Sequence, residues 1–500
     1  MLPTTREFEA ALAIVEKLRG EGYEAYLAGG CVRDLLLDRE PIDYDVATSA
    51  TPDIVLELFP RTFAVGAHFG VVLVAADDGA DDARQSGYIC TEVATFRSDL
   101  AYSDGRHPDA VRYTLSAGKD VQRRDFTING LLLDPTRIGP TRAAIPAPAR
   151  RAAMKGRGFS PCTPPAQDTA ALAPEEIPLR AAVLDFVGGL ADLDAGVVRA
   201  IGRAETRFEE DHLRMLRAVR FAARFGFEIE AETKRAIRAL AARIHAVSRE
   251  RIRDELTKML TEGHARRAFE LLDETGLLAE ILPEIARMHG IEQPPQFHPE
   301  GDVWIHTLLL LEQLPTGCAA TLAWGALLHD IGKPPTFRRA PDRIRFDGHV
   351  EIGVAMGAEI CRRFRFSNEL TRQVLALIEN HMRFADAPRM KQSTLKRFFR
   401  LEGFDQHLAL HRMDCLAAHG NLEIYDFVRQ RRAAMSEEAV RPRPLLSGRD
   451  LIAAGYKPGP AFKGMLTAVE DAQLEGAIST AEDALALVRE RFGNPPPSTC

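Results

Sequence analysis

Cysteine is scarce in this sequence and is never arranged as a structural pair. The seven cysteines are scattered over 500 residues, and no two of them form a C-x-x-C pair, so we expect neither a disulfide framework nor a cysteine-based zinc site. Apolar runs of membrane-spanning length are absent, and the charged N-terminal residues are not those of a targeting segment. We therefore expect a protein of the reducing cytoplasm with no membrane association.

An excess of positive charge is also lacking. The 64 basic and 71 acidic residues give a net charge of −7, which excludes a bulk polycation but not a local basic stripe that binds nucleic acid. Hydrophobic residues make up 46% and charged residues 27%, which is typical of a globular protein. The length predicts about three or four domains. No internal repeat is visible, and no feature indicates an obligate protein partner.

The short apolar runs predict an α+β protein whose first part, 1–136, is an α/β head with a mixed sheet and flanking helices. Thr4 and Glu7 have the spacing of a capping box for a helix that ends near Gly20. A further helix is expected to start near Thr51. The expected strands of the head are 25–28, 44–47, 70–75 and 88–95.

Residues 137–180 differ in composition from the segments around them. They are rich in Ala, Pro and Arg, with six basic residues and no acid between Arg137 and Arg157. The absence of periodicity predicts a flexible insertion. A basic arm that touches RNA is one interpretation, and a solvated linker is the simpler one.

From Glu205 onward the apolar spacing is helical almost to the end. The helices expected first are 211–225, 231–241, 249–261 and 265–275. Further strands are expected only at 183–186 and 197–201. Proline-rich boundaries at 294–299 and 442–444 then give a helical neck (181–292), a second helical domain (293–436) and a helical tail (437–500).

Two acids in the head are spaced for metal binding. Asp43 and Asp45 are one residue apart, and alternate residues of a strand point to the same side. Two carboxylates on one face repel each other unless a cation is present, and Mg²⁺ is commonly held by one or two carboxylates and substrate phosphates. Gly29 and Gly30 let backbone amides approach a phosphate, and Arg33 can hold a triphosphate. The pattern suggests nucleotidyl transfer, although a surface strand with two acids would look the same.

The motif RRDFTING places three polar residues together. Asp125 and Asn129 are four residues apart, so they share one face of a helical turn and can contact a ribose edge. Arg124 can reach a triphosphate. A salt bridge at a helix start is the alternative.

The motif EDHLRMLRAVRF has charged residues at intervals of three. Asp211 and Arg214 are spaced i, i+3 on the expected helix, and Arg217 and Arg220 continue the ridge of cations. A solvated basic face is the alternative, but apolar residues surround the last two arginines.

In this order along the chain, the segments GGCVRD, DYD, VATFRSD, DGRHPD, RRDFTING, EDHLRMLRAVRF and SRERIRDEL resemble the class II tRNA nucleotidyltransferases and bacterial poly(A) polymerases. The resemblance covers the head and neck. It implies that Asp43 and Asp45 hold catalytic Mg²⁺. It also implies that the incoming nucleotide contacts several residues of these motifs, namely Gly30, Arg33, Arg124, Arg217 and Arg220.

The resemblance assigns base selection to Asp211 and Arg214. Arginine only donates hydrogen bonds, and an ionised aspartate only accepts them. Cytosine and adenine both present an acceptor beside an amino donor, so one Arg–Asp pair satisfies either base. Uracil and guanine present an N–H to the arginine, and such a buried mismatch costs about 1–3 kcal/mol. The pair would thus select C and A without a nucleic-acid template.

Two further features of the head are less specific. Glu92 is a candidate third carboxylate that would help to position the metals, and it could equally be a strand-edge charge. The loop Tyr102–Pro108 is polar and contains glycine. In the family, the corresponding loop is flexible and helps the site change between bases.

A second candidate site lies in the helical domain around the segment LLHDIGKP. It resembles the HD metal-dependent phosphohydrolase module, whose four signature positions are filled here by His306, His329, Asp330 and Asp414. His349 and His381 are available for a second metal. Imidazole and carboxylate ligands suit Mn²⁺, Ni²⁺, Fe²⁺ or Zn²⁺, and the expected chemistry is hydrolysis of a phosphomonoester or a 2′,3′-cyclic phosphate at an RNA end. A decayed module kept for RNA docking is the alternative.

Two helical segments near the end have weaker signals. Residues 445–466 predict a helix capped by Ser447, a Pro-Gly-Pro turn and a second helix. Similar tails in the family grip the tRNA elbow, and a packing hairpin is the alternative. The segment KQSTLKRFFR at 391–400 could line the RNA path, but an amphipathic core helix is favoured.

The resemblance and the motifs together predict an enzyme that adds C and A from CTP and ATP to tRNA 3′ ends, building CCA. Mg²⁺ is expected in the head, and Mn²⁺, Ni²⁺ or another transition metal in the HD-type domain. A poly(A) polymerase or an A-adding enzyme shares these motifs. The alternative from another class is a hydrolase centred on His329 and Asp330, with a head that merely binds RNA.

Overall fold

The computed structural model describes residues 3–63, 70–77, 88–99, 111–138 and 178–495. The chain divides into two compact units, Met1–Leu240 and Ala241–Cys500. The predicted loop Tyr102–Pro108 lies outside the described residues, as does nearly all of the predicted insertion 137–180.

A seven-stranded mixed sheet forms the centre of the first unit. Its strands are β1 (Ala25–Ala28), β2 (Asp45–Thr48), β3 (Thr62–Phe63), β4 (Val71–Asp77), β5 (Tyr88–Thr95), β8 (Leu131–Leu133) and β9 (Val183–Asp185). Their order in the sheet is β3-β4-β5-β2-β1-β8-β9. The β2–β5 pair is parallel and the other pairs of this sheet are antiparallel. The four strands predicted for the head are all present, and a short hairpin of β6 (Arg97–Asp99) and β7 (Val111–Tyr113) adds to them.

Two neighbouring strands of this sheet, β8 and β9, lie on either side of the predicted insertion in the sequence. Leu133 of β8 pairs with Val183 of β9, although the insertion separates them in sequence. The Asp134 N–H donates to the carbonyl of Ala182, 3.0 Å away. The last strand of the sheet therefore comes from the chain that follows the insertion.

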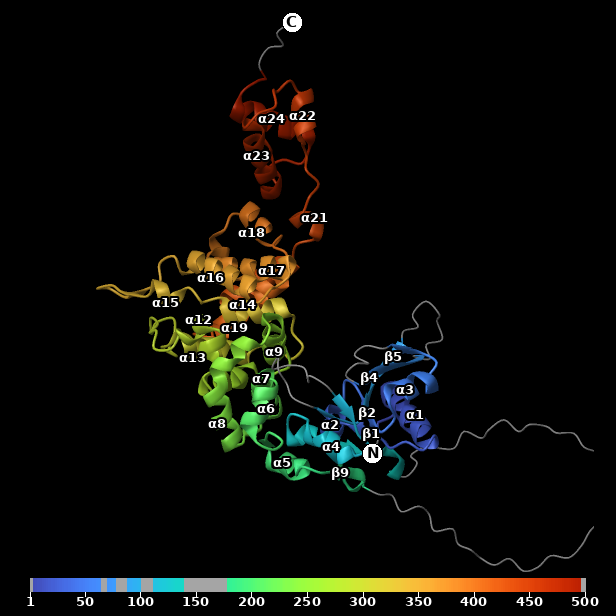
Figure 1. Ribbon diagram of the computed structural model, residues 1–500. Helices are drawn as coiled ribbons and strands as arrows, with labels where there is room; N and C mark the ends of the chain where they lie inside the picture. The colour runs from blue at the N-terminus through green and yellow to red at the C-terminus, as the bar shows by residue number, and fades with distance from the viewer. Residues whose placement is uncertain (1–2, 64–69, 78–87, 100–110, 139–177, 496–500) are drawn as a thin grey trace, which may run out of the picture. The chain divides into compact units, whose positions relative to one another are not determined.

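The structure describes eight α-helices in the first unit, and the first three of them have the main contacts with the sheet. The eight are α1 (Arg6–Gly20), α2 (Gly30–Leu36), α3 (Pro52–Leu58), α4 (Ala117–Gln122), α5 (Gly189–Ala195), α6 (Ala204–Glu210), α7 (Leu213–Phe225) and α8 (Ala231–Leu240). Helix α1 buries Val15 and Leu18 and packs against the sheet, as α3 does (Figure 1). The predicted capping box at Thr4 is wrong by one residue, because Thr5 has the extended backbone of an N-cap and its hydroxyl accepts from the Phe8 N–H at 3.3 Å.

The expectation of an all-helical chain after Glu205 needs correction. A parallel pair joins β10 (Val197–Val198) to β11 (Glu228–Ile229), and a hairpin joins β12 (Arg338–Arg339) to β13 (Ile344–Arg345). β10 lies within the strand predicted at 197–201, whereas β11, β12 and β13 were not predicted. Each of these three strands has two residues, which is too short for a period-2 pattern to show.

The second unit is mainly helical. Its helices are α9 (Arg249–Thr261), α10 (Ala265–Glu274), α11 (Leu277–Ile281), α12 (Pro283–Ala286), α13 (Val303–Glu312), α14 (Ala320–Leu328), α15 (Lys333–Thr336), α16 (His349–Arg363), α17 (Asn368–Asn380), α18 (Gln392–Phe398), α19 (Phe404–Ala417), α20 (Glu423–Ala433), α21 (Glu437–Val440), α22 (Gly448–Ala453), α23 (Ala461–Glu475) and α24 (Ala481–Phe492). In the part of the chain that the structure describes, none of the helices combines the length and apolarity of a membrane span.

The segment 391–400 is a core helix, as predicted. Phe398 of α18 and the adjacent Phe399 are buried with the aromatic residues around Phe384. The opposite, polar side of α18 contacts α23. Lys396 Nζ donates to the carbonyl of Leu474 at 2.7 Å, close to the C-terminus of α23, where a positive charge is stabilising.

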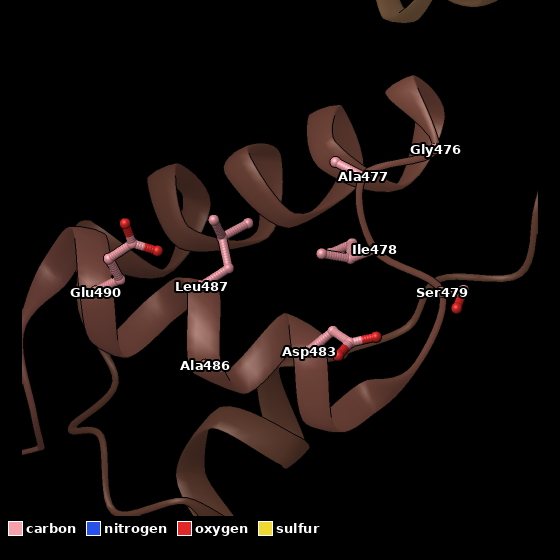
Figure 2. Close-up of a pocket in the computed structure, with 8 residues that line it drawn as sticks. All are labelled: Gly476, Ala477, Ile478, Ser479, Asp483, Ala486, Leu487 and Glu490. Carbon is pink, nitrogen blue, oxygen red and sulfur yellow. The ribbon is translucent and has the colours of Figure 1, made fainter.

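The tail forms a small helical bundle with its own apolar cluster. Ser447 caps α22 in a capping box with Asp450, as the sequence predicted. A hollow of about 310 Å³ lies in this bundle. Figure 2 shows the residues that line it, which come from the loop between Gly476 and Ser479 and from one face of α24. The charged residues of its lining are Asp483 and Glu490, so the hollow is unsuited to an RNA phosphate.

Candidate active sites

The two acids of the head lie where β2 begins. Asp45 is the first residue of β2 and faces Ala28 across the pairing with β1. Burial alternates along this segment: Asp43 is exposed, Tyr44 is buried against Phe8, and Asp45 is half-buried. Tyr44 therefore points into the core, and the alternation leaves both carboxylates on the other side.

Glu92 completes a group of three acids. It precedes Val93, which pairs with Val46 in the parallel register of β2 and β5, so it lies beside Asp45. Burial, followed by the charges of Glu92 and Asp43, raises the pKa of Asp45 to about 7. Among the described residues, these acids do not form a three-ligand cluster within 4.8 Å. They fit Mg²⁺, which takes its remaining ligands from water and substrate phosphates.

Gly29 keeps space open for Arg124. Its φ of +72° lies in the region that favours glycine, and a Cβ added there would lie 3.0 Å from Arg124 Nη1. The guanidinium of Arg124 is held by the buried Asp120, with its Nη2 3.1 Å from Asp120 Oδ2. Gly30 follows as the first residue of α2. The two glycines thus allow a close approach between the backbone and a cationic side chain, next to the acids.

A chain of hydrogen bonds joins the head to α7. Arg33 Nη1 donates to Asn129 Oδ1 at 2.5 Å, Asn129 Nδ2 donates to Asp125 Oδ1 at 3.0 Å, and Arg217 Nε donates to Asp125 Oδ2 at 2.8 Å. Burial would raise the pKa of Asp125, but Arg217 and Asn129 outweigh it and hold this pKa at about 2. Arg33 is 4% exposed, and Asp34 accepts its two other hydrogen bonds. The structure therefore brings these predicted residues into one network.

The helical turn predicted for Asp125 and Asn129 is wrong. The α-helix α4 ends at Gln122, and a 3₁₀ turn covers Thr127–Asn129, so Asp125 lies outside both. Its side chain accepts from the N–H of Phe126 at 2.8 Å. The proximity that the spacing predicted is present, but a bend produces it rather than a shared helix face.

Asp211 and Arg214 do not share a helix either. Asp211 has an extended backbone that ends α6, and its Oδ1 accepts from the N–H of Leu213 at the start of α7. Arg214 Nη1 donates to Glu210 Oε2 at 2.6 Å. The predicted helix 211–225 therefore starts two residues late, because Asp211 interrupts it, and Glu210 orients Arg214.

The two further arginines predicted on α7, Arg217 and Arg220, differ in exposure. The side chain of Arg217 is 35% exposed, whereas Arg220 is buried and its guanidinium lies 4.5 Å from the ring centre of Phe221. The predicted ridge of cations thus runs from a partly exposed position at Arg217 to a buried position at Arg220.

Six side chains from five parts of the second unit meet at the predicted HD-type site. His306 lies on α13, His329 and Asp330 follow α14, His349 starts α16, His381 follows α17, and Asp414 lies on α19. Their ligand atoms form two groups within 4.8 Å, one of His306, His329 and Asp414 and one of Asp330, His349 and His381. The second group contains His349 and His381, which the sequence analysis considered available for a second metal, together with Asp330, which it assigned to the HD signature.

Contacts at the Nδ1 atoms orient the imidazole rings of the cluster. The Nδ1 atoms of His329, His349 and His381 donate to backbone carbonyls at 2.7–3.0 Å, and Nδ1 of His306 lies 2.8 Å from Glu300 Oε1. Each ring therefore presents its Nε2 to the cluster. Among the described residues, these four Nε2 atoms are buried without a hydrogen-bond partner, although His306 Nε2 lies 3.1 Å from Asp414 Oδ1. Buried polar atoms without partners are rare, and histidines held in this way are typical of metal ligands.

The protonation of two members of the cluster fits the same interpretation. Burial would raise the pKa of Asp330, but His329 and Lys333 hold it well below its usual range. Burial lowers the pKa of His381 to about 4, so its ring is neutral at pH 7 and its Nε2 carries a lone pair. Ionised carboxylates and neutral imidazoles are the forms that bind transition metals.

His306 differs from these two members. Burial would lower the pKa of His306, but its contacts with the carboxylates of Asp414 and Glu300 outweigh burial and raise this pKa to about 9. A metal bound there would therefore displace a proton.

Sequence reasoning missed three residues of this site. Glu300 orients His306 and also lies 2.8 Å from Nδ1 of His298. Lys333 Nζ lies 2.6 Å from Asp330 Oδ2. Gly332 is needed for close packing, because a Cβ there would lie 2.0 Å from the carbonyl oxygen of His349. Gly332 and Lys333 lie within the segment LLHDIGKP, so the motif itself could have indicated these two residues.

Three family profiles match the chain. They are the poly A polymerase head domain at residues 25–140, the probable RNA and SrmB-binding site of polymerase A at 226–288, and the HD domain at 302–403. Their order agrees with the head, neck and HD-type domain. The HD match covers the first five of the six cluster residues along the chain.

Relatives with established names agree with these profiles. The CCA-adding enzyme of Latilactobacillus sakei is 34% identical over 331 residues, which is 65% of this chain and 70% of that protein. The enzyme of Lactobacillus gasseri is 34% identical over 61% of this chain and 64% of its own length, and that of Streptococcus thermophilus is 27% identical over 96% of both. For several relatives the matched part spans about half to two thirds of their length.

Solved structures extend the similarity to almost the whole chain. The CCA-adding enzyme of Bacillus stearothermophilus in complex with CTP has a TM-score of 0.66 at 25% identity, covering 98% of both chains. The Thermotoga maritima enzyme complexed with tRNA has a TM-score of 0.54 at 16% identity, which supports the fold alone. With the agreement of motifs, profiles and fold, the chain belongs to the family of CCA-adding enzymes.

Proposed function

We propose that this chain is a template-independent tRNA nucleotidyltransferase that adds C and A from CTP and ATP to tRNA 3′ ends, with release of pyrophosphate. The observation that carries the proposal is the group of Asp43, Asp45 and Glu92 beside Arg124 and Gly29. In this proposal 1–136 is the catalytic head, 181–292 selects the base and contacts RNA, and 437–500 binds tRNA. Its cysteine usage fits a cytoplasmic location.

Each of the predicted site residues has a separate role in the proposed reaction. Asp43 and Asp45 would hold Mg²⁺, which lowers the pKa of an attacking 3′-hydroxyl and offsets the charge on departing pyrophosphate. Arg124 and Arg217 supply positive charge for the triphosphate. Asp125 and Asn129 face the ribose, and Arg214, oriented by Glu210, donates to the acceptor of cytosine or adenine.

Addition to defined tRNA ends tests this proposal. tRNA transcripts that end before CCA, after C and after CC receive labelled CTP, ATP, UTP or GTP separately, and then CTP with ATP. Two C additions followed by one A and a stop are expected. Addition of A to the CC end alone would instead identify an A-adding enzyme, and long A tracts on any RNA would identify a poly(A) polymerase.

We also propose a second activity, a metal-dependent phosphohydrolase at the HD-type site that acts on RNA ends. Four buried Nε2 atoms aimed at two ionised carboxylates support it. These side chains would hold Mn²⁺, Ni²⁺ or a similar ion, which activates water towards phosphorus. Water adds to phosphorus and the ribose oxygen leaves as an alcohol. Asp43→Ala should abolish nucleotide addition and leave hydrolysis intact, while Asp330→Ala should do the opposite. Hydrolysis that survives Asp330→Ala would contradict the assignment.

A further inference from the structure

A cavity of about 700 Å³ opens beside the HD-type cluster. Asp330, His349, His381 and Asp414 lie in its wall. Its volume is within the range of sites that enclose a small organic ligand, and a phosphate group alone would leave most of it empty. The rest of the wall therefore determines which molecule presents a phosphate to the cluster.

One part of this wall is apolar and open. Phe297 is 56% exposed and Met382 is 51% exposed, and both line the cavity. Large apolar side chains that stay accessible inside a cavity indicate a ligand with an apolar surface. A nucleobase is such a surface, and bases of any sequence stack on aromatic rings.

Another part of the wall is basic. The β12–β13 hairpin contributes Arg343 and Arg345. Arg345 Nη2 donates to Asp342 Oδ2 at 2.8 Å, and Nε of Arg343 lies 3.9 Å from the same oxygen, beyond hydrogen-bond distance. The carboxylate of Asp347 is paired with Arg338 at 2.8 Å. One carboxylate thus serves two guanidinium groups, which leaves positive charge on the hairpin part of the wall for a second phosphate. The acid Glu423 lies elsewhere in the wall, on α20.

We propose that the cavity binds the 3′-terminal nucleotide of an RNA, with the base on Phe297, the terminal phosphate at the HD-type cluster and the preceding phosphodiester at Arg343 and Arg345. This inference rests on the hydrolase activity proposed above and names the residues that select its substrate. A phosphomonoester without a base would contact the HD-type cluster but not Phe297.

Two substrates separate the selecting wall from the cluster. The full-length protein, loaded with Mn²⁺ or Ni²⁺, hydrolyses either a trinucleotide that ends in a 3′-phosphate or glycerol phosphate, which has no aromatic ring. Phe297→Ala and the double variant Arg343→Ser with Arg345→Ser should raise KM for the trinucleotide roughly tenfold and leave KM for glycerol phosphate unchanged. Arg339→Ser is the matched control, because Arg339 lies on the same hairpin and neither it nor its partner Glu292 is in the cavity wall. An unchanged thermal unfolding transition of the full chain confirms that each variant is folded.

A binding measurement on the metal-free protein needs no turnover. The trinucleotide carries 2-aminopurine as its 3′-terminal base, whose fluorescence is quenched when it stacks. Quenching is expected in the wild type and in Arg339→Ser, and its loss is expected in Phe297→Ala. Equal quenching and an equal trinucleotide KM in Phe297→Ala would overturn the inference. If neither the trinucleotide nor glycerol phosphate is hydrolysed but quenching still depends on Phe297, the hydrolase proposal fails and the binding site stands.

Discussion

The backbone of Gly332 packs directly against the carbonyl of His349, so that a Cβ on Gly332 would lie 2.0 Å from that oxygen and 2.7 Å from the N–H nitrogen of Gly353. Both contacts are to the backbone of α16, which cannot move aside as a flexible side chain can. Gly332 follows Asp330 by two residues, and His349 is the first residue of α16. Glycine at this position therefore determines how closely two members of one metal group, Asp330 and His349, approach each other.

Gly332→Ala should weaken the group formed by Asp330, His349 and His381. A shift of α16 moves His349 away, and the loss of a well-placed partner typically costs about 10–100-fold in metal affinity. We expect the bound metal, measured by mass spectrometry after equilibrium dialysis, to fall from two ions to one per chain.

Gly459→Ala is the control for this substitution, because a Cβ at Gly459 meets nothing within 4 Å. Nucleotide addition by the head should be unchanged in both variants. Two ions in Gly332→Ala, with wild-type affinity, would show that His349 is not a metal ligand.

The Mg²⁺ requirement of nucleotide addition should depend strongly on pH. A proton competes with Mg²⁺ for Asp45, whose pKa is raised to about 7 by burial, Glu92 and Asp43. The half-saturating Mg²⁺ concentration should therefore fall about tenfold between pH 6 and pH 8 and change little above pH 8. Initial rates of C addition over a Mg²⁺ titration at each pH measure it.

Glu92→Gln distinguishes two roles for the third acid. If Glu92 acts through its charge on Asp45, removing that charge lowers the pKa of Asp45 and moves the transition to lower pH. Activity at saturating Mg²⁺ would then persist at pH 8. Complete loss of activity at all Mg²⁺ concentrations would instead make Glu92 a metal ligand.

Asp125 should contribute to stability as an ionised group. Its pKa in the folded protein is about 2, below the ordinary 3.8, so its contribution is present above about pH 4 and is lost as the pH falls through 2. At pH 7 this corresponds to about 2 kcal/mol, and Asp125→Asn should lower the free energy of unfolding by that order. Urea unfolding of the full chain at pH 7, 5 and 3 should show the gap to wild type shrinking by about half at pH 3. A gap that does not vary with pH would contradict the ionic role.

Long elements could be predicted from the sequence, because their patterns repeat. The helix 249–261 and the strand 88–95 have the predicted bounds in the structure. The break at Asp211 could not be predicted from periodicity, since the apolar spacing runs on through it, and the backbone changes direction where Asp211 accepts from Leu213 N–H. The two-residue strand β11 forms only because β10 lies beside it.

The candidate sites also contain residues that could be predicted from the sequence and relationships that could not. The HD-type residues could be chosen from their types and order, and the structure brings all six together. The raised pKa of Asp45 depends on its burial and then on the charge of Glu92, which the parallel pairing of β2 and β5 places beside it. The role of Glu300 depends on the distance to His306. Such relationships come from tertiary structure, so residue types alone could nominate Glu92 but could not show its effect.

The contact between Glu210 and Arg214 should govern base selection. Arg214 Nη1 donates to Glu210 Oε2 at 2.6 Å and to the carbonyl of Arg207 at 3.1 Å, so one edge of the guanidinium is committed to the protein. Glu210→Gln keeps the shape of the side chain but removes its charge. A hydrogen bond to a charged group contributes about 1.5–3 kcal/mol, so Arg214 should become less well oriented and kcat/KM for CTP should fall at least tenfold.

Glu209→Gln is the matched control, because Glu209 is the exposed neighbour of Glu210 in α6. Single-turnover addition of each of the four nucleotides to a tRNA that lacks CCA gives the selectivity directly. In Glu210→Gln the ratio of CTP to UTP incorporation should fall, because a mobile arginine no longer faces the N–H of uracil at a fixed position. A fall in kcat/KM of the same size for all four nucleotides would mean that Glu210 supports the fold of α6 and α7 rather than base selection. If Glu210→Gln and Glu209→Gln behave equally, Glu210 has no role in the mechanism.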